Sequence, residues 1–165
     1  MNRRKWYLVI VAGLALVVAS PLAGCGKESD VPYAPDFTLP TIDGESVTLN
    51  DFRGQPVMLT FWTIACPACE IQMPHIQALY EQVASEEPVV LTVNVGDGAP
   101  PVHEYVASHE LTFPVLLDLQ GRVAQAYGLP GVPITFFIDV EGVVSAYKIG
   151  PFQSQEEIER VLDSL

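Results

Sequence analysis

Hydrophobic and polar positions follow two different periods along residues 36–165. Two short runs, residues 57–62 and 89–95, are almost wholly apolar, as expected of strands that are covered on both faces. After Cys66 the period becomes that of an amphipathic helix, with an apolar stripe formed by Ile76, Leu79, Tyr80 and Val83. A buried strand followed directly by a helix is therefore the central feature that the pattern predicts.

Turn signals divide the rest of this region into further elements. Residues 37–39 and 47–49 flank Asp43-Gly44 and predict an opening β-hairpin. The other expected elements are helices at 102–108, 122–127 and 154–165, a strand at 113–117, and a closing hairpin of strands 134–139 and 143–149. The last helix begins with a capping box, in which Ser154 is the N-cap and Glu157 lies three residues on. This order predicts an α/β fold with a mixed central sheet flanked by helices.

Charge is distributed unevenly along the chain. The net charge is −12, yet residues 1–24 carry Arg3, Arg4 and Lys5 and no acidic residue, so the remainder carries −15. Such an acidic remainder excludes nucleic acid as a main partner, because phosphate binding needs basic surface. A basic start, an uncharged run at 6–19 and an acidic remainder predict an export signal joined to a soluble domain.

The uncharged run ends in Leu22-Ala23-Gly24-Cys25, which resembles the bacterial lipobox. This resemblance implies cleavage before Cys25, lipidation of Cys25 and attachment to a bacterial membrane outside the cytoplasm. Residues 1–24 would be the signal peptide, residues 25–35 a polar tether and residues 36–165 the folded domain. An uncleaved N-terminal anchor is the alternative, and it places the domain in the same compartment.

Cys66 and Cys69 form a Cys-Pro-Ala-Cys motif where the strand at 57–62 turns into the helix. A thiolate there meets unpaired backbone N–H groups and the positive end of the helix dipole, which lowers the pKa of Cys66 below the 8.5 or so of a free thiol. Cys69 lies one turn further along and can attack a mixed disulfide formed at Cys66. The motif therefore predicts thiol–disulfide exchange, in which Cys66 attacks and Cys69 resolves.

Other uses of the two cysteines fit the sequence less well. A structural disulfide across so short a loop would restrict the unfolded chain little. A zinc site usually needs four ligands, and the spacing of His75, His103 and His109 supports none. We therefore expect neither a metal nor another cofactor.

A second motif, Gly131-Val132-Pro133, lies just before the strand predicted at 134–139, and Trp62 lies four residues ahead of Cys66. Together with the closing hairpin and helix, these features resemble the thioredoxin fold. The N-terminal hairpin and the inserted strand and helix around 89–108 further resemble the membrane-tethered TlpA/ResA/CcmG-type thiol–disulfide oxidoreductases of the redoxin family. The resemblance covers about residues 35–165.

This resemblance implies a site and partners. Val132–Pro133 would be a cis peptide bond against Cys66, with an ordinary trans proline as the alternative, and the Val132 backbone would pair with an extended substrate strand. Trp62 would pack beneath the site, and Pro67 and Ala68 would complete the substrate-binding set. The implied substrates are exported proteins with disulfides, such as apocytochrome c, which the protein would reduce with electrons from a CcdA-like membrane donor.

The chain also departs from the family pattern at the site. Ala65 stands where thioredoxin-like sites commonly carry Trp, Thr60 stands at the position of the buried acid of thioredoxin, and Gln72 stands where many TlpA/ResA-type proteins carry Glu. Both usual carboxylates that would act as a base for Cys69 are thus missing. Glu70 is a further candidate for a proton shuttle, but it is expected to face solvent.

Two other functions are kept as alternatives. A peroxiredoxin-like peroxidase would explain Thr63 three residues before Cys66, although Leu59 stands where that motif needs Pro. A non-enzymatic metal-delivery or chaperone module would use Cys66, Cys69 and His75, although the CxxC spacing differs from the CxxxC of copper-chaperone relatives.

Overall fold

The computed structural model describes residues 33–83 and 87–164. The predicted signal peptide, the lipidation site Cys25 and most of the predicted tether lie outside these residues. Within the described part of the chain, no helix combines the length and the apolar character that crossing a bilayer requires.

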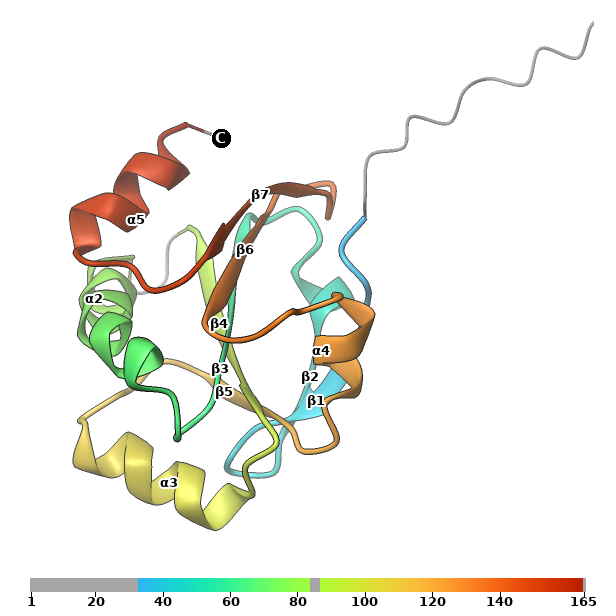
Figure 1. Cartoon of the computed structure of the whole chain (residues 1–165). Helices are drawn as coiled ribbons and strands as arrows, with labels where there is room; N and C mark the ends of the chain where they lie inside the picture. Colours follow the sequence, from blue (N-terminus) through green and yellow to red (C-terminus); the bar gives the residue numbers. More distant parts are fainter. Residues whose placement is uncertain (1–32, 84–86, 165) are drawn as a thin grey trace, which may run out of the picture. The chain divides into compact units, whose positions relative to one another are not determined.

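A five-stranded mixed sheet forms the centre of the fold (Figure 1). The strand order is β5 (Val115–Asp118), β4 (Val89–Val95), β3 (Val57–Trp62), β6 (Ile134–Ile138) and β7 (Val144–Ile149). The β3, β4 and β5 strands run parallel, whereas β6 and β7 run antiparallel to their neighbours. The central strand β3 therefore lies between a parallel half and an antiparallel half of the sheet.

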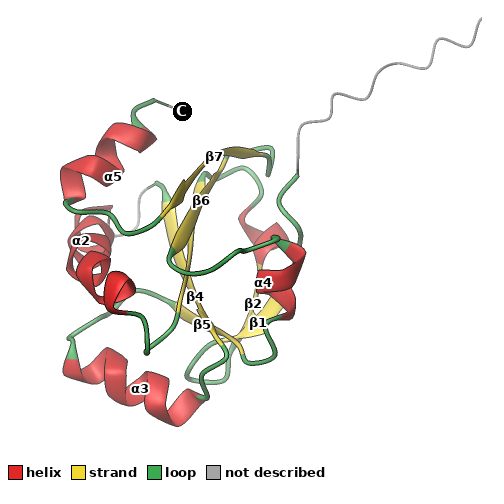
Figure 2. Cartoon of the chain, in the orientation of Figure 1, coloured by secondary structure: helices red, strands yellow, loops and turns green. Residues whose placement is uncertain are grey.

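Different elements cover the two faces of this sheet (Figure 2). One core contains side chains of α2 (Pro67–Val83), α3 (Ala99–Ser108) and α5 (Gln155–Leu162). The other contains side chains of the hairpin β1 (Thr38–Pro40) and β2 (Ser46–Thr48), the 3-10 turn η1 (Leu49–Phe52) and α4 (Arg122–Ala126). This arrangement confirms the predicted order of strands and helices and the mixed sheet.

Strand β3 is apolar on both faces because it contributes to both cores. Met58 and Trp62 belong to the core under α2, whereas Leu59 and Phe61 belong to the opposite core, and all four side chains are fully buried. Alternation of side chains along a strand produces this division. The rigid strand therefore ends, at Trp62, in a well-packed position immediately before the cysteine motif.

Several element boundaries differ from the predicted ones. Helix α3 begins at Ala99, three residues before the predicted start, because Pro100 and Pro101 fit a first helical turn, where their missing N–H groups would be unpaired anyway. Strand β5 begins at Val115 and not at 113, since Pro114 has no N–H to donate to the ladder.

The predicted tether extends into residues that belong to the domain. Tyr33 pairs with Val143, Ala34 donates a backbone hydrogen bond to Gly142, and Ala34 is buried. At the other end of the chain the predicted N-cap is confirmed, because Ser154 Oγ accepts a hydrogen bond from the Glu157 N–H at the start of α5.

Candidate active site

The cysteine motif lies at the carboxyl end of the central strand. Trp62, the last residue of β3, is paired with Asn94 of β4, so the loops that follow these two parallel strands emerge side by side. Sites of α/β proteins commonly form at such a position, where the strand order reverses. Only residues 63–66 separate β3 from α2, and this short loop places Cys66 directly before the helix.

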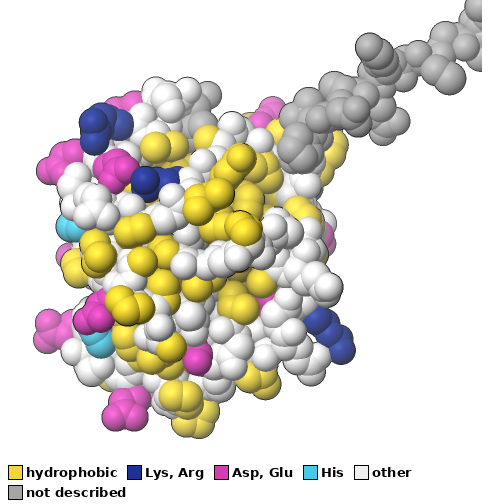
Figure 3. Space-filling view, viewed as in Figure 1, with side chains coloured by type: hydrophobic (Ala, Val, Ile, Leu, Met, Phe, Trp, Pro, Cys, Tyr) yellow, Lys and Arg dark blue, Asp and Glu magenta, His cyan; other side chains and the backbone are white. Residues whose placement is uncertain are grey.

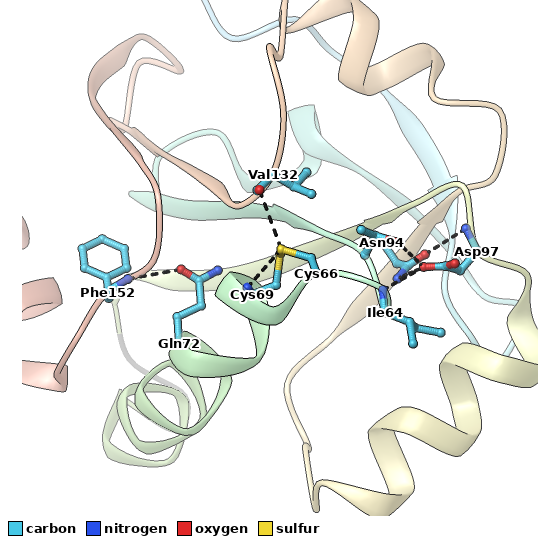
Figure 4. Close-up of a disulfide and its surroundings, with 9 residues drawn as sticks. Ile64, Cys66, Cys69, Gln72, Asn94, Asp97, Val132 and Phe152 are labelled. Atoms are coloured by element: carbon cyan, nitrogen blue, oxygen red, sulfur yellow. Dashed lines mark hydrogen bonds between the residues drawn. A yellow bond between two sulfur atoms is a disulfide. The ribbon is translucent and has the colours of Figure 1, made fainter.

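Cys66 and Cys69 are joined in a disulfide, with their Cα atoms 5.2 Å apart (Figure 4). The two sulfurs differ in access, because Cys69 is fully buried whereas Cys66 is partly exposed. The Cys69 N–H lies 3.0 Å from Cys66 Sγ and also donates to the Cys66 carbonyl oxygen at 2.9 Å. The geometry favours Cys66 as the sulfur that reacts with an external partner. The attacking role of Cys66 and the resolving role of Cys69 stay predictions.

The loop before β6 lies against the disulfide. The Val132–Pro133 bond is cis, as predicted, and Cys66 Sγ lies 3.7 Å from the Val132 carbonyl oxygen. This loop is held to the end of β7, because Gly150 N–H donates to the Pro133 carbonyl oxygen at 2.9 Å. Two segments 66 residues apart in the sequence thus meet at one sulfur.

The remaining predicted contact residues divide into buried and exposed ones. Trp62 is fully buried in the core that contains Cys69, and its ring centroid lies 5.2 Å from that of Tyr105 in α3. It therefore packs in the core beneath the site, as predicted, but it presents no surface to a substrate, in contrast to its predicted place in the substrate-binding set. Pro67 is exposed and Ala68 half-buried, so both are accessible beside the disulfide.

No carboxylate lies buried beside Cys69. Thr60 is fully buried, and its hydroxyl is hydrogen-bonded to that of Thr135 at 2.9 Å. Gln72 is also fully buried; its Oε1 accepts a hydrogen bond from Phe152 N–H at 3.4 Å, whereas its Nε2 has no partner. Among the described residues the buried charged side chain is Asp118, whose oxygens accept the first N–H groups of α4. Among the described residues, the interior around Cys69 is therefore mainly apolar, with a few neutral polar groups and no charged side chain.

Charged groups lie on the outer side of the site. Glu70 follows Cys69 in α2, is 66% exposed, and lies 4.0 Å from Nε2 of His109. It faces solvent, as the sequence predicts.

Asp97, which sequence reasoning missed, lies on the loop after β4. Its Oδ2 accepts hydrogen bonds from Thr63 Oγ1 at 2.7 Å, Ile64 N–H at 2.9 Å and Asn94 Nδ2 at 3.0 Å. Desolvation raises the pKa of Asp97, but the three hydrogen bonds outweigh it and hold that pKa below its usual range. A single carboxylate oxygen thus fixes the loop that leads into Cys66. Within the described residues, no three His, Cys, Asp or Glu side chains gather closely enough to hold a metal ion.

Comparison with known proteins gives consistent matches. The model of the AhpC/TSA family matches residues 33–147. A thiol-disulfide oxidoreductase, ResA of Geobacillus kaustophilus, is 38% identical over 80% of this chain and 75% of its own length.

Two solved structures have similar folds. A thiol:disulfide interchange protein DsbE from Chlorobium tepidum has a TM-score of 0.73 and 28% identity, covering 80% of this chain and 94% of its own. The exposed lipoprotein thioredoxin Etrx1 of Streptococcus pneumoniae has a TM-score of 0.67 and 30% identity, covering 79% and 100%. These similarities confirm the predicted thioredoxin-like fold.

Proposed function

Because the chain belongs to the AhpC/TSA family and is a protein thiol–disulfide oxidoreductase, we propose that its Cys66–Cys69 pair reduces disulfides of exported proteins. The observation that carries this proposal is the disulfide at the start of α2, with one accessible and one buried sulfur. Cys66 is the sulfur that an external protein can reach, and Cys69 is the one that closes the cycle.

The exchange proceeds in two steps. The Cys66 thiolate attacks one sulfur of a substrate disulfide, forming a mixed disulfide and releasing the other substrate sulfur as a thiolate, which takes up a proton. Cys69 then loses its proton and attacks Cys66 Sγ, which re-forms the Cys66–Cys69 disulfide and releases the second substrate thiolate. Two electrons and two protons pass to the substrate, and a dithiol donor must return them to the pair.

The Val132 backbone provides the docking position for the substrate. Its carbonyl oxygen lies 3.7 Å from Cys66 Sγ, so an extended substrate segment paired with this backbone would bring its own sulfur to Cys66. Exposed Pro67 forms the neighbouring surface. This geometry recognises backbone and a disulfide, and it suits a range of protein substrates.

The proposed location follows from the N-terminal sequence. The basic and apolar residues before Leu22-Ala23-Gly24-Cys25 support export and lipidation at Cys25, and the similarity to an exposed lipoprotein thioredoxin supports the same arrangement. In that location, apocytochrome c is a candidate substrate, and a membrane dithiol protein of the CcdA type is the candidate donor. Palmitate labelling of the wild type and of Cys25→Ala tests the anchor, because label that persists in the variant contradicts lipidation there.

A trapping experiment tests the function. Cys69→Ala should accumulate mixed disulfides through Cys66 in the producing bacterium, and mass spectrometry would identify the trapped proteins. Cys66→Ala is the matched control and should trap none.

Purified wild-type protein should reduce insulin disulfides with dithiothreitol much faster than it consumes hydrogen peroxide. The opposite ranking of the two rates would contradict the proposal in favour of a peroxidase. Insulin reduction that survives in Cys66→Ala would contradict the assigned site.

A further inference from the structure

The loop that leads into Cys66 is held by the side chain of Asp97, which follows the neighbouring strand β4. Thr63 and Ile64 both donate to Oδ2 of Asp97, and Asn94 supplies a third donor to the same oxygen. Asn94 also accepts from the Asp97 N–H at 3.2 Å and is itself fully buried. The carboxylate is therefore fixed on the loop after β4 and points toward the loop at Ile64 (Figure 4).

The charge of Asp97 lies near the backbone of the reacting cysteine. Ile64 N–H is 2.9 Å from the carboxylate, and two residues span at most about 7 Å, so the carboxylate is within about 10 Å of the Cys66 backbone. That distance is comparable with the Debye length in physiological salt, so the interaction is only partly screened.

The other charges around the site do not compensate for Asp97. Residues 54–121, which include α2 and α3, contain no Lys or Arg. Figure 3 shows acidic side chains and histidine over this part of the surface, with the basic side chains toward its edges. Glu70 of α2 adds a further negative charge and lies 4.0 Å from Nε2 of His109, the residue that follows α3. Tyr105, which stacks on His109, is neutral because burial and Glu70 raise its pKa.

We propose that Asp97 is a positioning residue with two effects: it anchors the Thr63–Ile64 loop, and its negative charge makes the Cys66–Cys69 pair more reducing. This inference rests on the proposed function of the pair. The sign follows from the electrostatics, because a carboxylate near Cys66 disfavours the thiolate and hence the reduced form. Destabilising the reduced form lowers the reduction potential, so electrons leave the dithiol more readily.

Asp97→Asn separates the two effects, since the amide oxygen can accept the same three hydrogen bonds without the charge. We expect the pKa of Cys66 to fall by about half a unit. Reaction of reduced protein with iodoacetamide over a range of pH measures it, with mass spectrometry identifying the modified cysteine.

Above the pKa of Cys66, the equilibrium with glutathione should shift about threefold toward the dithiol, or about 15 mV. The shift should vanish below that pKa, where the thiol is protonated in both proteins. A purely structural role would not produce this dependence on pH.

Asp97→Ala tests the anchor. Amide hydrogen exchange at Ile64 should accelerate about tenfold or more in this variant and stay near the wild-type rate in Asp97→Asn. Unchanged protection of Ile64 in Asp97→Ala would refute the anchoring role.

The matched control is Asp139→Asn. Asp139 also accepts hydrogen bonds in a loop, from Val143 N–H and Ser145 Oγ, but it follows the end of β6 that is remote from Pro133. The Asp139→Asn variant should leave the pKa of Cys66 and the glutathione equilibrium unchanged. Equal shifts in both variants, or no shift in Asp97→Asn, would refute the electrostatic role. Either failure leaves the proposed function standing as long as insulin reduction depends on Cys66 and Cys69.

Discussion

Gln72→Glu would place an ionisable group in the uncharged interior behind the disulfide. Gln72 is fully buried three residues after Cys69, accepts one hydrogen bond from Phe152 N–H, and leaves Nε2 without a partner. Lys148 lies over the Phe152 ring, but its Nζ is already 2.9 Å from a carboxylate oxygen of Glu157. We therefore expect the folded state of this variant to be destabilised when the new carboxyl is ionised, and not when it is protonated.

The expected cost follows from the difference in pKa between the folded and unfolded states. A glutamate has a pKa of about 4.3 in the unfolded chain, and burial without a cation raises it, by up to several units in fully buried sites. A rise of about two units, at about 1.4 kcal/mol each, costs the folded state about 3 kcal/mol at pH 8. Because the folded pKa is raised, this cost is absent below about pH 4 and grows as pH rises toward about 6.

Urea unfolding of the oxidised protein at several pH values measures this cost. The difference in free energy of unfolding between wild type and Gln72→Glu should be small at pH 4 and should reach its full value by pH 8. Gln125→Glu is the control, because Gln125 is exposed on α4 and its variant should show no such dependence. A difference for Gln72→Glu that stays constant between pH 4 and 8 would mean that water or a cation reaches this position, and it would refute our description of the interior around Cys69.

Three further substitutions test the packing and capping that hold the site. Ser154→Ala should lower the free energy of unfolding by about 1 kcal/mol in urea titrations, because the Glu157 N–H loses its acceptor; no change would contradict the cap. Burial raises the pKa of Tyr127 well above its usual range, and its buried hydroxyl has no partner. Tyr127→Phe should therefore leave stability unchanged or raise it by up to about 1 kcal/mol, and a clear loss would reveal a partner. Thr135→Val should cost about 1–3 kcal/mol by orphaning the Thr60 hydroxyl, and adding Thr60→Val should restore part of the loss, as a double-mutant cycle would measure.

The elements that the sequence predicted best are those whose own residues show that both of their faces are buried. Strand β3 and strand β4 are nearly continuous apolar runs because both faces of each are covered, and a run of that kind is visible without knowing its neighbours. The pairing of Cys66 with Cys69 could be predicted equally well, since two cysteines with this spacing at a strand-to-helix junction are typical of redox chemistry.

Contacts that depend on register could not be predicted in the same way. The role of Asp97 arises because Trp62 pairs with Asn94, which brings the ends of β3 and β4 to the same level. A shift of one residue would turn these side chains to the other face of the sheet. Tyr33 was assigned to the tether for a similar reason, because nothing in residues 25–35 indicates that it pairs with Val143, more than a hundred residues later.

The contacts of Thr60 and Gln72 show what changes when these two residues depart from the family pattern. Each replaces a carboxylate by a neutral polar group, so the buried side of the disulfide carries no charge, whereas Asp97 and Glu70 are charged on the outer side. No buried carboxylate in the described residues can then take the proton of Cys69, so that proton must leave toward the opening beside Cys66. The substrate thiolate released in the first step is the base that the exchange itself provides for this proton. On this argument the rate of the second step should rise with the pKa of the substrate thiol released first, which takes the proton, and fall with the pKa of the substrate thiol bonded to Cys66, because a more basic thiolate leaves more slowly.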